Sequence, residues 1–309
     1  MAKAADITPT LNERNSLGKK LREVFKRYFA LTKPTITLLV VVTTIPGLLI
    51  DTSALPSLEL FLYTLLGAGL SSASAATFNQ IVEQSTDRTM ARTQRRGVAS
   101  GDVSSFGAMA FAMLLGSVGL GFLYHNVNTA AMLVAFTGHI YYVVLYTMIL
   151  KKRTPQNIVI GGGAGAVGPM IGAAAITGTV TPSAWLLFAL IFLWTPPHFW
   201  ALALKYKEDY AQAGIPMYPV VYGDEKTRKA MYLYTLSLLP TVLLLIAVAN
   251  LGIVSSLISV LLTLEFCRRA HILYKSKSND TAMSVFHFSC SYTFIIFAAI
   301  AVEKFIFLI

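Results

Sequence analysis

Leu58–Arg88 reads LELFLYTLLGAGLSSASAATFNQIVEQSTDR, an apolar run that ends in acids and amides. The hydrocarbon core of a bilayer takes about 20 residues of α-helix. Leu58–Ile81 meets that length with Glu59 as its only charged residue. The run therefore predicts a membrane-spanning helix that delivers polar side chains to one membrane surface.

Similar runs recur along the whole chain. Of its 309 residues, 55% are hydrophobic and 13% are charged, whereas a soluble domain carries about 25% charged residues. The expected spans are Thr35–Ile50 (with a start near Ala30), Leu58–Ile81, Phe106–Tyr124, Thr129–Leu150, Ile158–Ile176, Ser183–Leu204, Met231–Asn250, Leu251–Cys267 and Val285–Ile309. The sequence thus predicts an all-α, polytopic membrane protein with about nine transmembrane helices.

The positive charge of the chain is gathered on one side of these spans. Every Lys and Arg except Lys304 lies in the N-terminal segment up to Lys33 or in a loop that follows an even-numbered span. Cytoplasmic loops carry such an excess of cations, so the pattern predicts a cytoplasmic N-terminus in a bacterial inner membrane. The net charge of +10 is divided among short loops between apolar runs, which favours a membrane surface over nucleic acid as partner.

Two loops on the expected cytoplasmic face are longer than the others. They follow the second and sixth spans, and this regular spacing predicts an internal duplication. Residues 1–30 are polar and basic, with neither the apolar core nor the cleavage site of a secretory signal. We therefore expect a basic cytoplasmic tail over residues 1–30 and a single transmembrane domain over residues 31–309.

Three oxygen-bearing side chains close the second span at helical spacing. Asn79, Glu83 and Asp87 are four residues apart, so a continuing helix places them on one stripe. Mg²⁺ prefers a few such oxygen ligands and completes its shell with water or phosphate oxygens. Cations suited to phosphate come next: Arg92, Arg95 and Arg96. A metal and phosphate site is one interpretation, and a polar helix end with a solvated charged loop is the other.

A second polar stripe follows the sixth span. The spacing of His198, Lys205 and Asp209 again predicts one helical face. We expect Pro196 and Pro197 to break the helix just before His198 and to free backbone carbonyls there. An ionisable group beside such a break at membrane depth is a functional candidate, and a structural histidine is the alternative.

Cations and glycines flank the loop after the fourth span. Lys151 and Lys152 lie at the end of that span, where they either set topology or bind phosphate. The fifth span begins with four glycines: Gly161, Gly162, Gly163 and Gly165. Small residues at this spacing either let helices pack closely or leave room for a bulky flat substrate.

Several strings in the sequence match one family of enzymes. They are Leu31-Thr-Lys33-Pro34, Asn79-x3-Glu83-x3-Asp87-x2-Met90-x-Arg92-Thr93, Tyr146-Thr147 through Leu150-Lys151, Thr154-Pro-Gln-Asn157-Ile-Val-Ile-Gly-Gly, Pro197-His198 and Asp209-Tyr210-x3-Gly214-Ile-Pro-Met217-x-Pro219-Val-Val-Tyr-Gly223. In these strings the chain resembles the intramembrane prenyltransferases of the 4-hydroxybenzoate polyprenyltransferase superfamily, and within it the branch that farnesylates protohaem IX. The resemblance runs from Phe29 to the C-terminus. Gly97 stands where this family has proline, and Lys152 where it has arginine, but no metal ligand is replaced.

The resemblance implies an activity and a role for each candidate residue. A farnesyl group passes from farnesyl diphosphate to a vinyl group of protohaem IX (haem B, a substrate), giving haem O, with Mg²⁺ as cofactor. The implied metal ligands are Asn79, Glu83 and Asp87, and the implied diphosphate-binding residues are Arg92, Arg95, Arg96, Lys151, Lys152 and Lys33. The implied catalytic residues are His198, Lys205, Asp209 and Tyr146. His198 either contacts the diphosphate or the haem propionates, ligates the haem iron, or moves the proton of the attacking water, and the sequence does not separate these roles. Membrane lipid surrounds the enzyme, and a haem A synthase or an oxidase assembly protein is the implied recipient of haem O.

Two other functions are compatible with the sequence. A quinone-type aromatic prenyltransferase belongs to the same superfamily and shares the stripe of Asn79, Glu83 and Asp87. A secondary transporter also uses repeats and broken helices, but it concentrates polar groups near the bilayer midplane. Here the polar stripes lie at the ends of spans, which favours chemistry at a membrane face.

Overall fold

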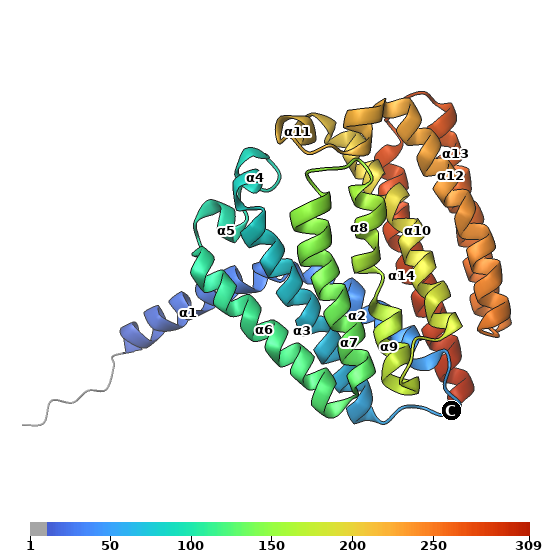
Figure 1. The fold of residues 1–309 in the computed structure, drawn as a ribbon, viewed down its shortest axis with the longest axis horizontal. Coiled ribbons are helices and arrows are strands. Elements are labelled where there is room, and N and C mark those ends of the chain that lie inside the picture. Colours follow the sequence, from blue (N-terminus) through green and yellow to red (C-terminus); the bar gives the residue numbers. More distant parts are fainter. Residues whose placement is uncertain (1–10) are drawn as a thin grey trace, which may run out of the picture.

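The chain folds into a bundle of long helices with short helices at one end (Figure 1). The computed structural model describes residues 11–309, with side chains from Gly18 onward. Its elements are α1 (Leu11–Leu31), α2 (Pro34–Leu49), α3 (Leu58–Val82), α4 (Gln84–Thr89), α5 (Gly97–Ser100), α6 (Ser105–Asn126), α7 (Thr129–Ile140), the π-helix η1 (Tyr141–Leu150), α8 (Asn157–Gly165), α9 (Gly168–Thr177), α10 (Pro182–Lys205), α11 (Lys207–Gln212), α12 (Tyr218–Val248), α13 (Ile253–Lys275) and α14 (Ala282–Leu308). The described residues contain no strand, so the all-α class is confirmed. Residues 1–10 of the expected tail lie outside the described residues.

The lengths and compositions of the helices are those of a polytopic membrane protein. Seven described segments are long and apolar enough to cross a membrane: Leu58–Val82, Ser105–Asn126, Thr129–Leu150, Asn157–Thr177, Pro182–Lys205, Tyr218–Val248 and Ala282–Leu308. An eighth is present if the bent pair α1 and α2 counts as one span. Helix α13, which overlaps the expected span Leu251–Cys267, carries Glu265, Arg268 and Arg269 and is not among them. The polytopic class is confirmed, whereas the number nine stays a prediction.

The first span differs from the expected one at its start. A single helix from near Ala30 is wrong, because α1 ends at Leu31 and α2 begins at Pro34, at 59° to α1. The ring of Pro34 disfavours the α-helical region for the residue before it. Lys33 lies outside that region, in the left-handed conformation with φ 47° and ψ 67°, and its side chain reaches α3. The bend therefore brings a cation to the end of α3.

Glycines let the central helices approach closely. A Cβ on Gly47 of α2 would lie 2.2 Å from the carbonyl oxygen of Pro169 on α9. A Cβ on Gly161 of α8 would lie 2.1 Å from the ring of Tyr146. These approaches support the close-packing interpretation of the glycines. The space beside Gly161 is filled by Tyr146, which is thereby held against α8.

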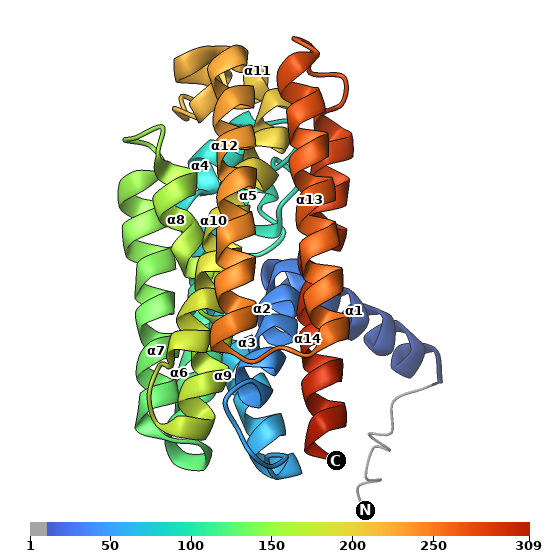
Figure 2. The ribbon, with the colours of Figure 1, turned by 90° about the vertical axis from the view of Figure 1, so that its right-hand side faces the viewer.

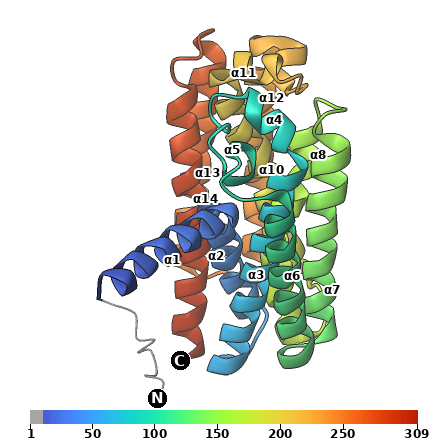
Figure 3. The same cartoon turned by 90° about the vertical axis from the view of Figure 1, so that its left-hand side faces the viewer.

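The short helices α4, α5 and α11 lie at the same end of the bundle (Figures 2 and 3). Both of the long loops therefore fold onto one face, as the charge pattern predicts. The expected helix break before His198 is wrong, because α10 continues through Pro196 and Pro197 to Lys205. Two consecutive prolines remove only two backbone donors, and packing against α8, α12 and α14 supports the helix across them.

Candidate functional site

Asn79, Glu83 and Asp87, called the oxygen stripe below, are buried together at the end of α3. Helix α3 ends at Val82, yet Glu83 N donates to Asn79 O at 2.9 Å and Asp87 N donates to Glu83 O at 2.8 Å. Helical hydrogen bonding thus continues into α4, and the three side chains share one stripe as predicted. Their exposures are 1%, 4% and 3%. The alternative of a solvated helix end is therefore wrong for these residues.

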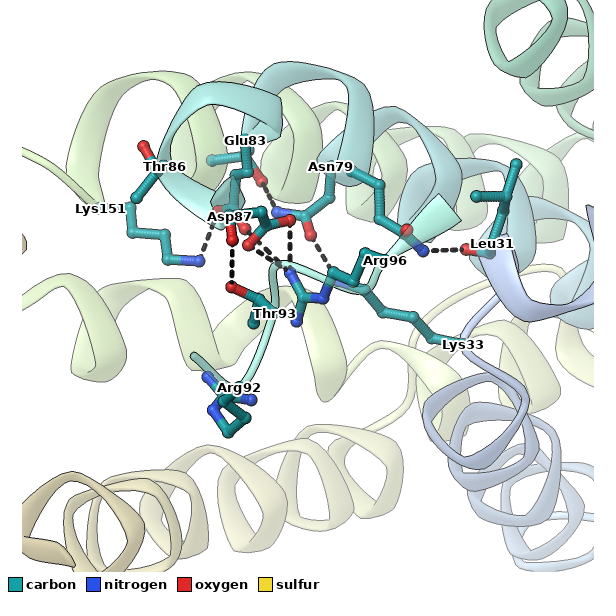
Figure 4. Close-up of polar contacts among 12 residues, drawn as sticks. Leu31, Lys33, Asn79, Glu83, Thr86, Asp87, Arg92, Thr93, Arg96 and Lys151 are labelled. Atoms are coloured by element: carbon teal, nitrogen blue, oxygen red, sulfur yellow. Dashed lines mark hydrogen bonds and ion pairs between the residues drawn. The ribbon is translucent and has the colours of Figure 1, made fainter. Parts of the chain in front are cut away.

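Two lysines from distant parts of the chain bind the oxygen stripe (Figure 4). Lys33 Nζ donates to Asn79 Oδ1, and Lys151 Nζ donates to Glu83 Oε1. Burial alone raises the pKa of the Glu83 carboxyl, but the nearby ammonium groups of Lys151 and Lys33 outweigh burial and lower that pKa. Glu83 is therefore a carboxylate in the folded protein.

An arginine binds the third member of the oxygen stripe. Arg96 Nη1 lies 2.8 Å from each carboxylate oxygen of Asp87 and 3.7 Å from Glu83 Oε2. Guanidinium and ammonium groups also suit phosphate oxygens. Lys33, Lys151 and Arg96, called the stripe cations below, are thus held where an incoming phosphate would meet them.

A threonine of the π-helix η1 orients the Asn79 amide. Thr147 Oγ1 donates its only hydrogen to Tyr142 O at 2.8 Å, so it can only accept from Asn79 Nδ2, at 3.1 Å. The amide nitrogen therefore faces Thr147, and Oδ1 faces Lys33. Sequence reasoning did not single out Thr147. Its only signal was its place in the Tyr146-Thr147 string.

Other side chains of the loop after α3 bind backbone. Arg88 Nε donates to Ala99 O at 2.9 Å, and Gln84 Nε2 donates to Val98 O at 3.1 Å. Both bonds tie α4 to α5. They fix the path of the chain that leads to Arg96, which explains how a loop residue is held beside buried carboxylates.

Three of the predicted phosphate-binding cations lie farther out. Arg92 Nη2 donates to Tyr210 Oη on α11 at 3.4 Å, and its guanidinium lies 5.9 Å from the centre of the Tyr206 ring. Arg92 therefore connects the two long loops. Arg95 and Lys152 are exposed, and their role in phosphate binding stays a prediction. Sequence reasoning missed both tyrosines, although Tyr210 lies within one of the matching strings.

His198 lies in an aromatic slot against α14. Its ring stacks between Trp194 and Phe286, with ring centres 4.3 and 4.7 Å away. His198 Nδ1 is 2.6 Å from Ser289 Oγ, whose hydrogen is donated to Phe286 O. This network assigns Nδ1 as the donor and leaves the lone pair on Nε2.

The second polar stripe also passes from one helix to the next. Helix α10 ends at Lys205 and α11 begins at Lys207, yet Tyr206 N donates to Leu202 O at 3.1 Å and Tyr210 N donates to Tyr206 O at 3.2 Å. Helical hydrogen bonding therefore continues across Tyr206, and a shared role of His198, Lys205 and Asp209 stays a prediction. Lys205 is exposed, with Nζ 5.7 Å from the Tyr206 ring centre. In the described part of the chain, no hydrogen bond or ion pair joins this stripe to the oxygen stripe.

Tyr146 lies beside the lysine that binds Glu83. The centre of its ring is 5.9 Å from Lys151 Nζ and 5.6 Å from the ring of Tyr142. The face of an aromatic ring attracts cations. Tyr146 is thus part of the wall next to the oxygen stripe.

The oxygen stripe suits a hard divalent cation that shares a phosphate. Among the side chains described from Gly18 onward, no group of three or more His, Cys, Asp and Glu could hold a metal ion by itself. The stripe offers two carboxylates and one amide oxygen, all buried. Mg²⁺ is commonly bound by one or two carboxylates together with the phosphates of a substrate. The donor set therefore fits Mg²⁺ with a diphosphate better than a metal held by protein alone.

Sequence comparison finds relatives along nearly the whole chain. The profile of the UbiA prenyltransferase family matches residues 40–295. The chain is 42% identical over 284 residues to a protoheme IX farnesyltransferase of Microcystis aeruginosa, a match that covers 91% of this chain and 90% of that protein. It is 40% identical over 283 residues to a protoheme IX farnesyltransferase of Bordetella avium, with coverages of 92% and 95%.

Two solved structures share the fold. One comes from a study of digeranylgeranylglyceryl phosphate synthase and matches with a TM-score of 0.76 at 20% identity, covering 91% of this chain and 99% of that chain. The other is a UbiA homologue from Archaeoglobus fulgidus bound to GPP and Mg²⁺, with a TM-score of 0.68 at 16% identity and coverages of 91% and 99%. At these identities the likeness establishes the fold alone.

Proposed function

The chain belongs to the UbiA prenyltransferase family, and from this premise we propose that it transfers a farnesyl group from farnesyl diphosphate to protohaem IX. The acceptor is a vinyl group, and the products are haem O and diphosphate. The observation that carries the proposal is the buried oxygen stripe with its three cations. The names of relatives at 42% and 40% identity support haem as the acceptor.

In this proposal Asn79, Glu83 and Asp87 hold Mg²⁺ together with the diphosphate. The metal, when bound, neutralises negative charge on the oxygens of the leaving group. The Archaeoglobus fulgidus homologue with GPP and Mg²⁺ supports a divalent metal beside a prenyl diphosphate in this fold. When the diphosphate binds, the stripe cations bind its phosphate oxygens in place of the carboxylate and amide oxygens of the oxygen stripe. Ammonium and guanidinium groups bind both kinds of oxygen well.

The stripe cations also favour cleavage of the substrate. The bond between C1 of the farnesyl chain and the diphosphate oxygen breaks, and its electron pair leaves with diphosphate. Arg92, Arg95 and Lys152 add positive charge around the same leaving group in this proposal. The leaving group is more negative in the transition state than in the bound substrate, so fixed cations lower the barrier.

The farnesyl cation then reacts with the vinyl group, whose π electrons form the new carbon–carbon bond. We assign the ring face of Tyr146 to stabilising the farnesyl cation. The cation that remains beside the haem ring takes oxygen from water, and the water releases a proton. We assign that proton to His198 Nε2, because Nδ1 already donates to Ser289. Lys205 and Asp209 complete this half of the site in the proposal. The Lys205 ammonium binds an anionic group of one of the substrates.

The proposal also includes a place in the cell. The cations of the long loops support a site at the cytoplasmic face of a bacterial inner membrane, with a cytoplasmic N-terminus. Residues 1–30 are then a cytoplasmic tail and residues 31–309 one catalytic domain. A haem A synthase or an oxidase assembly protein is the proposed recipient of haem O.

The proposed reaction is tested by comparing haem B with 4-hydroxybenzoate as the prenyl acceptor. Purified protein is given farnesyl diphosphate and Mg²⁺ with either haem B or 4-hydroxybenzoate, and mass spectrometry identifies the products. Haem O without prenylated benzoate is the expected result. Prenylated benzoate without haem O contradicts the proposal and favours a quinone-type enzyme, and passage of substrate across proteoliposomes without any transfer favours a transporter.

A further inference from the structure

Helix α1 presents an apolar face that the bundle leaves uncovered. Leu21, Val24, Phe25 and Phe29 have exposures of 61%, 49%, 67% and 51%. Their spacing places them on one side of the helix. The rings of Phe25 and Phe29 stack with centres 5.8 Å apart. Such a contiguous apolar face needs a partner, since it is costly to leave in water.

Cations lie on both sides of this apolar face. At about 100° of turn per residue, the stripe through Leu21 and Phe25 is flanked on one side by Arg22 and on the other by Lys20 and Arg27. From Gly18 onward, the basic residues of α1 are Lys19, Lys20, Arg22, Lys26 and Arg27, and all are exposed. Over the same range, from Gly18 to Leu31, its only acidic residue is Glu23.

The course of α1 suits a helix that lies along a membrane surface. It meets α2 at 59° and leaves the bundle sideways (Figures 1 and 3). Under it, a cavity of 470 Å³ opens between α1, α2, α3 and α6, and it is lined almost wholly by apolar side chains. Phe25, Tyr28 and Phe29 form its α1 wall, and Val41, Leu66 and Phe111 are among the residues opposite.

We propose that α1 docks into the headgroup layer of an anionic phospholipid leaflet. The apolar face and the cavity below it take acyl chains, while the flanking lysines and arginines bind headgroup phosphates. A helix with one apolar and one basic face binds anionic lipid by both contributions. The proposal is independent of farnesyl transfer, because none of these α1 side chains belongs to the proposed site.

Spin labels on the full chain in lipid nanodiscs test this docking. With Cys267→Ser and Cys290→Ser as background, one label is placed at Phe25→Cys and another at Lys26→Cys. Accessibility to oxygen and to a water-soluble nickel complex gives the depth of each label. We expect the label at position 25 to be shielded from nickel and the label at position 26 to reach it. We also expect the label at position 25 to lie deeper in phosphatidylcholine mixed with phosphatidylglycerol than in phosphatidylcholine alone.

A variant that lacks three cations of α1 isolates the electrostatic contribution to lipid docking. In the triple variant Lys20→Gln, Arg22→Gln and Arg27→Gln, the label at position 25 should lie at the same depth in the two lipid compositions. The matched control is Lys229→Gln, Lys275→Gln and Lys277→Gln, which removes three exposed cations elsewhere in the chain and should keep the difference in depth. Equal depths at positions 25 and 26 overturn the docking, and equal depths in the two lipids overturn its anionic selectivity.

Discussion

At the scale of single residues, the orientation of the Asn79 amide depends on the Thr147 hydroxyl. Thr147→Val removes the acceptor of Asn79 Nδ2 and lets the amide rotate. We expect the Mg²⁺ concentration for half-maximal haem O formation to rise about 10-fold, as for other residues that position a metal ligand. Thr147→Ser keeps the hydroxyl and should stay close to the wild type. Titration of the rate with Mg²⁺ measures the change.

Thr77→Val is the matched control for this substitution. Thr77 is also buried and donates to a helix carbonyl, that of Ala73 at 2.9 Å. It lies two residues before Asn79 on α3, so its loss reports on packing near the site without changing the amide. If both valine variants show the same Mg²⁺ dependence, Thr147 has no positioning role.

The ionised Glu83 makes part of the stability depend on pH. Burial raises the pKa of Glu83, and Lys151 and Lys33 overcome this and lower it in the folded protein. Its contribution is therefore complete above the usual carboxyl pKa of about 4.3 and is lost as pH falls through the folded value. We expect the melting temperature of Glu83→Gln to fall less steeply on acidification than that of the wild type. Glu59→Gln, at the exposed start of α3, should follow the wild type, and identical slopes for all three proteins count against the assignment.

At the scale of helices, the two long loops meet where Arg92 donates to Tyr210. Tyr210→Phe removes the acceptor and loosens α11 from the loop that holds Arg96. The bond is long, so we expect KM for farnesyl diphosphate to rise about 3-fold, in line with a contribution below about 1 kcal/mol. Steady-state kinetics measure KM and kcat separately. Tyr222→Phe, at an exposed tyrosine, is the control and should change neither KM nor kcat. An unchanged KM in Tyr210→Phe would show that the position of Arg92 does not depend on α11.

Local spacing predicted the helical path of both stripes. The bonds from Glu83 to Asn79 and from Asp87 to Glu83 keep a helical path, so a relation four residues long was enough. In the same way, Tyr206 N donates to Leu202 O and Tyr210 N donates to Tyr206 O between α10 and α11. The spacing did not reveal that Lys205 is exposed whereas the oxygen stripe is buried. The continuation of α10 through two prolines depends on neighbouring helices, which a single segment does not contain.

The pairing of cations with the oxygen stripe was likewise beyond the sequence. Lys33 and Asn79 are 46 residues apart, and Glu83 and Lys151 are 68 apart. Which cation meets which oxygen depends on the packing of α2, α3 and η1. Composition predicted that cations and acids would share a membrane face, since that follows from hydropathy and charge counting alone.

At the scale of the whole molecule, the cations of the basic face have different partners. The stripe cations bind the oxygen stripe, and those of α1 from Gly18 onward are exposed. Arg268 and Arg269 pair with Glu265 on α13, and Lys207 pairs with Asp224. Charge counting treats all of these residues alike. The fold separates a small group that can act on a diphosphate from a larger group that can set topology or bind lipid.

The two long loops also resemble each other in their helices. Helix α4 follows α3 and helix α11 follows α10, and each short helix has six residues. Both lie at the same end of the bundle (Figure 1). The arrangement agrees with an internal duplication, which stays a prediction. Of these two helix pairs, only α3 and α4 carry a buried stripe of oxygens with bound cations.

The central claim is that the oxygen stripe binds a metal and a diphosphate together. Calorimetric binding of farnesyl diphosphate, with Mg²⁺ or with a chelator, to the wild type, Asp87→Asn and Asp102→Asn tests it most directly. Asp102 is an exposed carboxylate that accepts a hydrogen bond from Ser100 at 2.8 Å and is the matched control. We predict Mg²⁺-dependent binding to the wild type and Asp102→Asn, and binding at least about 10-fold weaker to Asp87→Asn. Binding to Asp87→Asn with the affinity and Mg²⁺ dependence of the wild type would contradict the claim.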